Sequence, residues 1–147
     1  MSNTQSISVH YASGLARIQE PVRDSLDSVV DEIRRIILSD FEIHKEVNDY
    51  LMKMRGKLFR PTLLLLASEV GGRSHKDAVA LAAVVELVHL ATLVHDDAVD
   101  HSVLRRGLPT VNHLWNHQVA IITGDFLYSR SILELTRIGR LEAVHSL

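Results

Sequence analysis

Cysteine is absent from the 147 residues, which excludes disulfide bonds and metal sites built from thiolates. Aromatic residues make up only 5% of the chain, and seven glycines and three prolines leave few points at which a helix must end. The net charge is −2 and no basic run occurs, so we expect no nucleic-acid partner. The segment 1–14 lacks the apolar core of a signal peptide, and we expect a soluble, cytoplasmic protein.

Apolar residues recur at helical spacing along most of the chain. After Pro21, which suits a first helical turn, one apolar stripe comprises Val22, Leu26, Val29, Val30, Ile33, Ile36 and Ile37. Asp40 is a candidate cap for a second helix, whose inward residues would be Ile43, Val47, Tyr50, Leu51 and Met54. A third helix is expected from Pro61 to the pair Gly71-Gly72, which would end it.

The longest expected helix runs from about His75 to Asp100, with Ser74 and Asp77 resembling a capping box at its start. Its apolar part carries Glu86 and His89 in the middle and is shorter than a usual membrane span, so we interpret it as a helix buried in protein.

A loop at 101–110 and another helix, from about His113 to Ile138 and ending at Gly139, would follow. The sequence shows neither strand-like alternation nor internal repeats.

These patterns predict an all-α, antiparallel bundle of about six helices over residues 19–147, preceded by a loose arm at 1–18. A new apolar stripe, Leu141, Val144 and Leu147, begins near the last residue. We interpret the unfinished stripe as a sign that this is the first half of a larger helical domain, whose exposed apolar surface is covered by association.

Three carboxylates stand together at the end of the longest helix. Asp96 and Asp100 are one turn apart on the same face, and Asp97 lies on their flank. Carboxylate oxygens grouped in this way suit Mg²⁺, which completes its shell with water and substrate phosphates. A solvated helix end is the ordinary alternative for such a cluster. The arginines at 105 and 106, which can bind phosphate oxygens, favour a diphosphate site.

Two other features carry weaker signals. His113 and His117 are four residues apart and could bind zinc, but without an evident third ligand a surface or interface role is the simpler interpretation. Asp125 lies within an apolar helical segment and is expected to have a partner, either catalytic or structural.

Four ordered motifs resemble the N-terminal half of the trans-type polyprenyl diphosphate synthases, which have the isoprenoid synthase fold. They are Gly56-Lys57-Leu58-Phe59-Arg60-Pro61, His95-Asp96-Asp97-Ala98-Val99-Asp100, Arg105-Arg106-Gly107-Leu108-Pro109-Thr110-Val111-Asn112 and Gly124-Asp125-Phe126-Leu127. The family carries a second aspartate-rich motif in its C-terminal half, and these 147 residues contain none.

The resemblance implies a role for each matching residue. Asp96 and Asp100 would hold Mg²⁺ on the allylic diphosphate, Asp97 would support them, and Arg105 would contact the same diphosphate. Isopentenyl diphosphate would be bound by Lys57, Arg60, His89 and Arg106. Arg55 and Leu58 depart from the family's usual glycine and arginine, which affects the loop's backbone freedom and its charge.

The implied reaction joins isopentenyl diphosphate to an allylic prenyl diphosphate. Ala91 and Thr92 stand where the family's bulky chain-stopping residues stand, and both are small, so the resemblance implies a long product that Ala91→Phe would shorten. The alternative is a non-catalytic half-size or regulatory subunit of a heteromeric synthase. Either version is expected to associate, with itself or with a complementary subunit.

Overall fold

A computed structural model describes residues 14–72, 75–139, 143 and 145. Residues 14–19 are helical and lead into a 3₁₀ turn, η1 (Glu20–Val22). The longer helices are α2 (Arg23–Ile36), α3 (Glu42–Met54), α4 (Phe59–Val70), α5 (His75–Val99) and α7 (His117–Ile138). Between α5 and α7 lie the two-residue strands β1 (Leu104–Arg105) and β2 (Leu108–Pro109) and the short helix α6 (Val111–Leu114). The predicted all-α helical bundle is confirmed.

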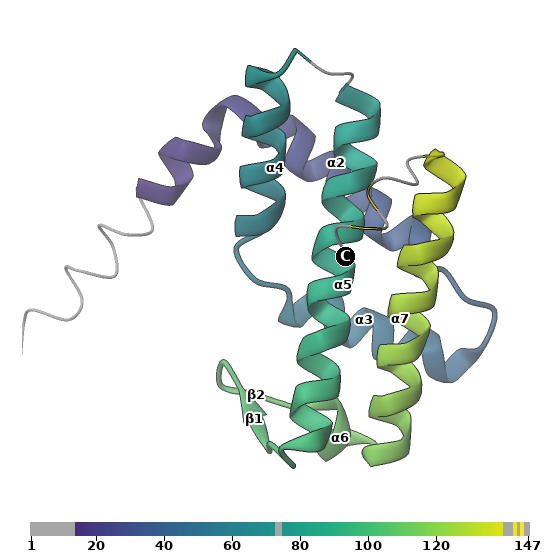
Figure 1. Cartoon of the computed structure of the whole chain (residues 1–147). Helices are drawn as coiled ribbons and strands as arrows, with labels where there is room; N and C mark the ends of the chain where they lie inside the picture. The colour runs from purple at the N-terminus through teal and green to yellow at the C-terminus, as the bar shows by residue number, and fades with distance from the viewer. Residues whose placement is uncertain (1–13, 73–74, 140–142, 144, 146–147) are drawn as a thin grey trace, which may run out of the picture.

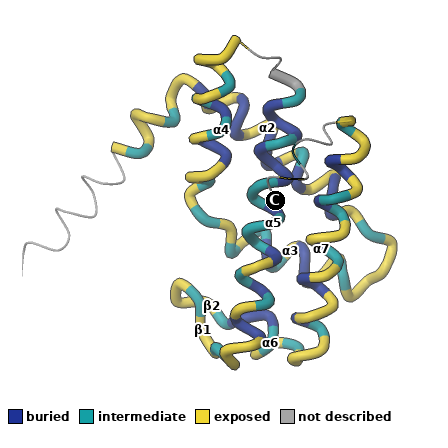
Figure 2. Tube along the Cα trace, in the orientation of Figure 1, coloured by how far each residue is buried: buried dark blue, intermediate teal, exposed yellow. Residues whose placement is uncertain are grey.

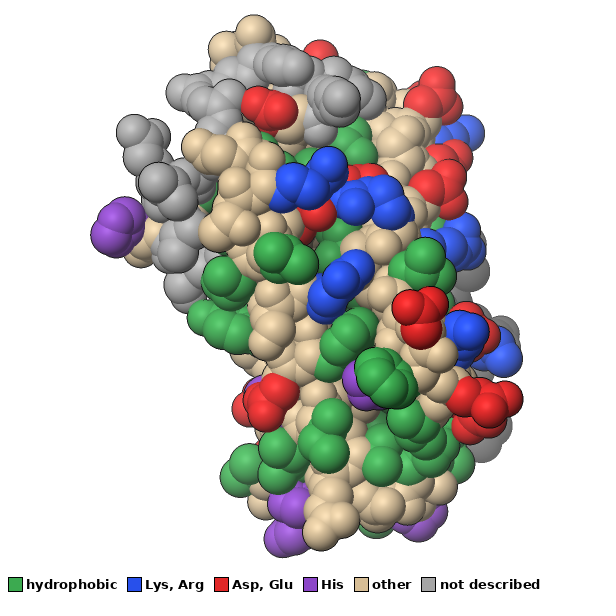
Figure 3. Space-filling view, turned by 90° about the vertical axis from the view of Figure 1, so that its right-hand side faces the viewer, with side chains coloured by type: hydrophobic (Ala, Val, Ile, Leu, Met, Phe, Trp, Pro, Cys, Tyr) green, Lys and Arg blue, Asp and Glu red, His purple; other side chains and the backbone are tan. Residues whose placement is uncertain are grey.

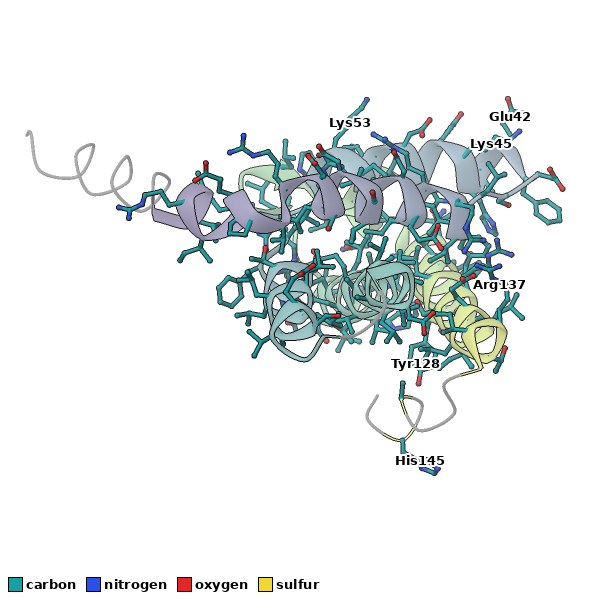
Figure 4. The ribbon with its side chains drawn as sticks, turned by 90° about the horizontal axis from the view of Figure 1, so that it is seen from above. Glu42, Lys45, Lys53, Tyr128, Arg137 and His145 are labelled. Carbon is teal, nitrogen blue, oxygen red and sulfur yellow. The ribbon has the colours of Figure 1, made fainter. Side chains whose placement is uncertain are left out.

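The helices form two layers. Helices α4, α5 and α7 run side by side in one layer, while α2 and α3 cross behind them (Figure 1) and form the second layer when the molecule is seen from above (Figure 4). Helix α5 is central and packs against α7, α4 and α2. Lys45 and Lys53 project from the outer side of α3, away from the first layer (Figure 4).

Helix α2 is set against the core by its apolar stripe, as its spacing predicts. All seven residues of that stripe are buried: Val22, Leu26, Val29, Val30, Ile33, Ile36 and Ile37. Figure 2 shows buried and exposed residues alternating along the helices. The last carbonyls of α2 are bound by side chains of two other helices, since Asn48 on α3 donates to Ile37 O (2.8 Å) and Arg130 on α7 donates to Ile36 O. These bonds satisfy groups that a helix end leaves without partners.

A charged cluster joins α2 to α7 next to the contact between Arg130 and Ile36. The carboxylate of Glu134 is almost completely buried and accepts from Arg137 (2.6 Å) and Arg35 (2.7 Å), and Arg35 also pairs with Glu32 (2.7 Å). Burial alone would raise the pKa of Glu134, but the hydrogen bonds from Arg137 and Arg35 outweigh it and lower that pKa. Glu134 is therefore buried as a charged group with its charge matched.

Several local expectations are wrong. Asp40 does not cap α3, because the N-cap is Phe41 without a side-chain cap, and Ile43 is exposed. Residues 14–18 are helical rather than loose chain, while 1–13 and Ser74, and with them the rest of the arm and the capping box, lie outside the described residues. The stripe at Leu141, Val144 and Leu147 lies outside them as well.

The expected helix at 113–138 is divided in two. Trp115 ends α6, and α7 begins after Asn116, whose side-chain oxygen accepts from Val119 N (2.8 Å). This is an N-cap hydrogen bond, so Asn116 marks the start of α7, which the apolar periodicity does not reveal. Gly139 ends α7 with a φ of +75°, as predicted.

The segment Asp77–Val99 is long and apolar enough to cross a membrane by length and composition. In the structure it is the central helix of the bundle, covered by α7, α4 and α2.

Candidate functional site

The end of α5 presents two exposed carboxylates, Asp96 and Asp100. The amide of Asp100 donates to Asp96 O (2.8 Å), so the two residues lie one helical turn apart. Neighbouring carboxylates repel each other and face the negative end of the helix dipole, which makes this turn a favourable place for a cation.

Asp97, between them, is only 5% exposed and has a different environment. It accepts two hydrogen bonds from Arg105, Nε to Oδ2 (2.7 Å) and Nη2 to Oδ1 (2.9 Å). These bonds raise the pKa of Arg105, to which the charges of Asp96 and Asp100 also contribute. The bidentate pair connects the end of α5 to β1 and leaves other N–H donors of Arg105 available for a ligand.

The loop expected at 101–110 is a hairpin with a two-residue turn. Leu104 pairs with Pro109 and Arg105 with Leu108, leaving Arg106 and Gly107 at the turn with φ values of +51° and +80°. Two positive φ angles define a type I′ turn, whose first position favours asparagine, aspartate or glycine and is unfavourable for a long side chain such as arginine. Arg106 is thus held in a strained conformation at the tip.

Two residues anchor this hairpin to the bundle. Tyr50 on α3 donates its hydroxyl to Pro109 O (2.7 Å), and its ring meets Trp115 edge-on, with ring centroids 5.6 Å apart. At the base of the hairpin the buried Thr110 donates to Ser102 O (2.6 Å). The strained turn is therefore supported from α3 and from its own base.

The turn brings Arg106 against the loop that joins α3 to α4. A Cβ added to Gly56 would lie 2.5 Å from Arg106 Nη1, so any larger residue at position 56 would displace the guanidinium from this place. Leu58 in the same loop has a φ of +52° and packs against the core at the start of α4. Lys57 is exposed, and its carbonyl accepts from Gln19 Nε2 (2.8 Å).

Arg106 shares a small pocket with Gly56, Glu86 and His89. Burial and then the positive charges of Arg60, Arg106 and Arg105 lower the pKa of His89. Burial raises the pKa of Glu86, although Arg60 and Arg106 oppose this, and Glu86 Oε2 is a buried oxygen without a hydrogen-bond partner in the described residues. The structure thus gathers Arg60, His89, Arg105 and Arg106 in one positive region beside the carboxylates.

The two residues expected to limit chain length have different surroundings. Ala91 is 1% exposed and belongs to the core, whereas Thr92 is exposed and lies one turn before Asp96 on the same face of α5. Thr92 is therefore the one of the two that shares the surface of the carboxylates.

The histidines at 113 and 117 are exposed, and the ring of His117 lies against His101 with centroids 5.5 Å apart. Within the described ranges, no three histidine, aspartate or glutamate side chains are grouped to hold a metal ion. The pair Asp96 and Asp100 still fits Mg²⁺, which takes one or two protein carboxylates and completes its shell with substrate phosphates.

Asp125 has the partner that the sequence leads us to expect, but it is not buried. Its side chain is 70% exposed, and Oδ1 lies 3.2 Å from His95 Nε2. The same nitrogen lies 3.2 Å from Ile121 O. A Cβ on Gly124 would collide with the His95 ring, so the imidazole occupies the space above that glycine.

Some supporting residues were missed from the sequence. The periodicity predicts Tyr50 only as an inward residue of its helix and assigns no role to Gln19. Both act through partners about 40 to 60 residues away, and helical periodicity carries no signal for such contacts.

Comparison with known proteins identifies the family of this chain. The family model for polyprenyl synthetases matches residues 41–147. Heptaprenyl diphosphate synthase component 2 of Geobacillus stearothermophilus is 36% identical over 82% of this chain and 38% of its own length. The geranyl-diphosphate-specific all-trans-nonaprenyl-diphosphate synthase of Rhodobacter capsulatus is 42% identical over 78% of this chain and 35% of its own.

Among solved structures, a polyprenyl synthase from Caulobacter crescentus, complexed with calcium and isoprenyl diphosphate, superposes with a TM-score of 0.83. It is 30% identical, and the match covers 88% of this chain and 39% of that one. The chain thus spans about 40% of the length of the proteins it matches.

Proposed function

Because this chain belongs to the polyprenyl synthetase family and has its all-α isoprenoid synthase fold, we propose that it forms the diphosphate-binding half of a trans-polyprenyl diphosphate synthase. The reaction condenses isopentenyl diphosphate with an allylic prenyl diphosphate and releases pyrophosphate. The observation that carries the proposal is the hairpin 104–109, which places Arg105 beside the carboxylates of α5 and Arg106 beside His89.

The two sides of the hairpin suit two diphosphates. On one side Asp96 and Asp100 would hold Mg²⁺, and the remaining donors of Arg105 would bind an allylic diphosphate. Bound Mg²⁺ would stabilise the negative charge that develops on the departing pyrophosphate. On the other side Arg60, Arg106 and His89, with the exposed Lys57, would bind isopentenyl diphosphate. The positive field that helps lower the pKa of His89 favours an anion there.

Charge and exposure also indicate what the residues do in the reaction. Arg105, held by two hydrogen bonds to Asp97, offers oriented donors to a leaving group that gains charge, with little reorganisation. The cation left on the allylic carbon needs an apolar surface that excludes water. The exposed face of α5 before Asp96 carries Thr92 and, four residues earlier, the half-buried Val88. We propose that this surface accepts the growing chain, and that the small Thr92 permits a long product.

A direct test uses the 147-residue chain and two binding measurements. We expect calorimetry to show binding of Mn²⁺, a probe for Mg²⁺, that Asp96→Ala abolishes, and binding of inorganic pyrophosphate that Arg106→Gln weakens. Asp27→Asn, which removes an exposed carboxylate from α2, is the matched control and should change neither. Turnover is then measured with isopentenyl diphosphate and allylic primers. Mn²⁺ affinity indifferent to Asp96 would contradict the proposal.

A second candidate is a subunit of a heteromeric synthase. It is favoured by the similarity to heptaprenyl diphosphate synthase component 2 of Geobacillus stearothermophilus. Figure 3 shows exposed hydrophobic side chains gathered on the lower part of the face it draws. The exposed apolar residues of α7 include Ile122, Tyr128 and Leu133. We propose that this surface is covered by association with a second copy or a complementary subunit. The native mass in source cells would distinguish a half-size subunit from a longer synthase.

A further inference from the structure

The exposed Asp96 stands between two neighbours that are each tied to a different part of the molecule. Asp97 is bound by Arg105 of the hairpin, and His95 reaches across to α7. Consecutive side chains on a helix point about 100° apart, so their directions from the helix axis are fixed relative to one another. Anchoring 95 on one side and 97 on the other therefore sets the direction in which Asp96 points.

The contact of His95 with α7 is specific in both shape and polarity. The ring lies where a Cβ of residue 124 would be, so glycine alone permits it at this helix spacing. Ile121 O and Asp125 Oδ1 are both acceptors and both lie 3.2 Å from Nε2, so this nitrogen must carry the hydrogen and donate. Gly124 thus leaves the space that the His95 ring occupies, and Asp125 provides an acceptor for its Nε2–H.

We propose that His95 is a positioning residue, held by Gly124 and Asp125, that sets the last turn of α5 so that Asp96 and Asp100 can share one divalent cation. The inference rests on the proposed cation site and assigns a role to Gly124 and Asp125, which need not touch substrate. Asp125 is 70% exposed and lies on another helix, so it is separate from the carboxylate pair itself. Loss of this anchor would leave both carboxylates present but free to turn with the helix end.

The test is a double-mutant cycle in the 147-residue chain with two readouts, Mn²⁺ affinity and thermal unfolding without metal. His95→Ala and Asp125→Ala, which removes the acceptor oxygen, should each weaken Mn²⁺ binding several-fold, and the double variant should bind no more weakly than the weaker single variant. If Asp125 acted only through its charge, the two effects would multiply, and the proposal would be wrong. Asp27→Asn controls for the loss of one negative charge.

Gly124→Ala tests whether the space above Gly124 is needed, because the added methyl group would displace the His95 ring while every charge remains. We expect Mn²⁺ binding to weaken with Gly124→Ala and to stay unchanged with Ser129→Ala, a similar change at an exposed position of α7. If Gly124→Ala fails to fold, the exposed Asp125→Ala variant still decides the question. Mn²⁺ binding that needs Asp96 but not His95 would overturn this inference alone, whereas binding that ignores Asp96 would overturn both.

Discussion

Arg106 lies so close over Gly56 that a Cβ at position 56 would be 2.5 Å from Nη1. The two residues are 50 positions apart and belong to different loops, yet they form one wall of the positive region beside His89. The contact explains why a residue without a side chain stands at position 56, independently of any turn geometry. It also brings the guanidinium at the hairpin tip against the loop that joins α3 to α4.

Gly56→Ala should therefore weaken binding of inorganic pyrophosphate. The added methyl group displaces the Arg106 guanidinium, and losing one hydrogen bond to a charged group costs about 1.5–3 kcal/mol, or roughly tenfold or more in affinity. Calorimetry checks this result. Gly14→Ala is the control, because a Cβ there meets nothing within 4 Å. Unchanged affinity in Gly56→Ala would show that the contact does not orient Arg106 for an anion.

Asp97→Asn should mainly lower stability, whereas Asp96→Asn should mainly weaken Mn²⁺ binding. Asp97→Asn breaks a buried bidentate pair and should lower the free energy of unfolding by about 1–3 kcal/mol. Asp96→Asn removes an exposed charge at a helix C-terminus and should change stability by no more than about 0.5 kcal/mol. Mn²⁺ affinity should fall more in Asp96→Asn than in Asp97→Asn. Urea unfolding with calorimetry separates the two, and equal destabilisation would contradict the assignment.

Tyr50→Phe should loosen the hairpin. It removes the hydrogen bond to Pro109 O, which contributes about 1 kcal/mol to stability, while the ring contact with Trp115 remains. Amide hydrogen exchange at the hairpin should quicken together with a lower urea midpoint. Tyr128 lies on the outer side of α7 (Figure 4) and is exposed, so Tyr128→Phe is the matched control. Identical exchange in the two variants would exclude Tyr50 as an anchor.

Acid should weaken the connection between α2 and α7 at Glu134. Hydrogen bonds from Arg137 and Arg35 hold the pKa of the folded-state carboxyl below the ordinary value of 4.5, in spite of its burial. A lowered folded-state pKa means that this contribution to stability is fully present above about pH 4.5 and is lost as pH falls through the folded-state value. Urea unfolding should show Glu134→Gln less stable than the natural chain at pH 7.

That difference between Glu134→Gln and the natural chain should shrink towards pH 3, because the natural carboxyl then becomes neutral as well. A difference that stayed constant from pH 7 to pH 3 would mean that the charge of Glu134 is not what stabilises the cluster. Asp24→Asn, an exposed change on α2, controls for general charge effects.

Product length should respond to Thr92 more cleanly than to Ala91. Ala91 is 1% exposed, so Ala91→Phe would overpack the core and confuse misfolding with a shorter product. Thr92→Phe places the ring on the exposed face one turn before Asp96. Chromatography of the products of an active assembly should show a shorter chain with Thr92→Phe. The same product length would remove Thr92 from the path of the growing chain.

Local sequence was sufficient to define helices and their buried faces. The stripe of α2, the extent of α5 and the ending of α7 at Gly139 depend on spacing and on termination by glycine, which act within a few residues. The same local order placed Asp96, Asp97 and Asp100 together at a helix end. The motifs that carry the family resemblance are contiguous segments, and for that reason the family was visible without a structure.

Tertiary structure decided how each member of that cluster is used. Asp97 is paired because the hairpin turns back towards α5, and Asp96 is exposed because its neighbours at 95 and 97 are anchored elsewhere. The contacts Gly56–Arg106, Tyr50–Pro109 and Gly124–His95 join positions between 29 and 59 residues apart. Helical periodicity specifies which face of a helix is buried, but the packing of whole helices against one another selects the side chain that it meets.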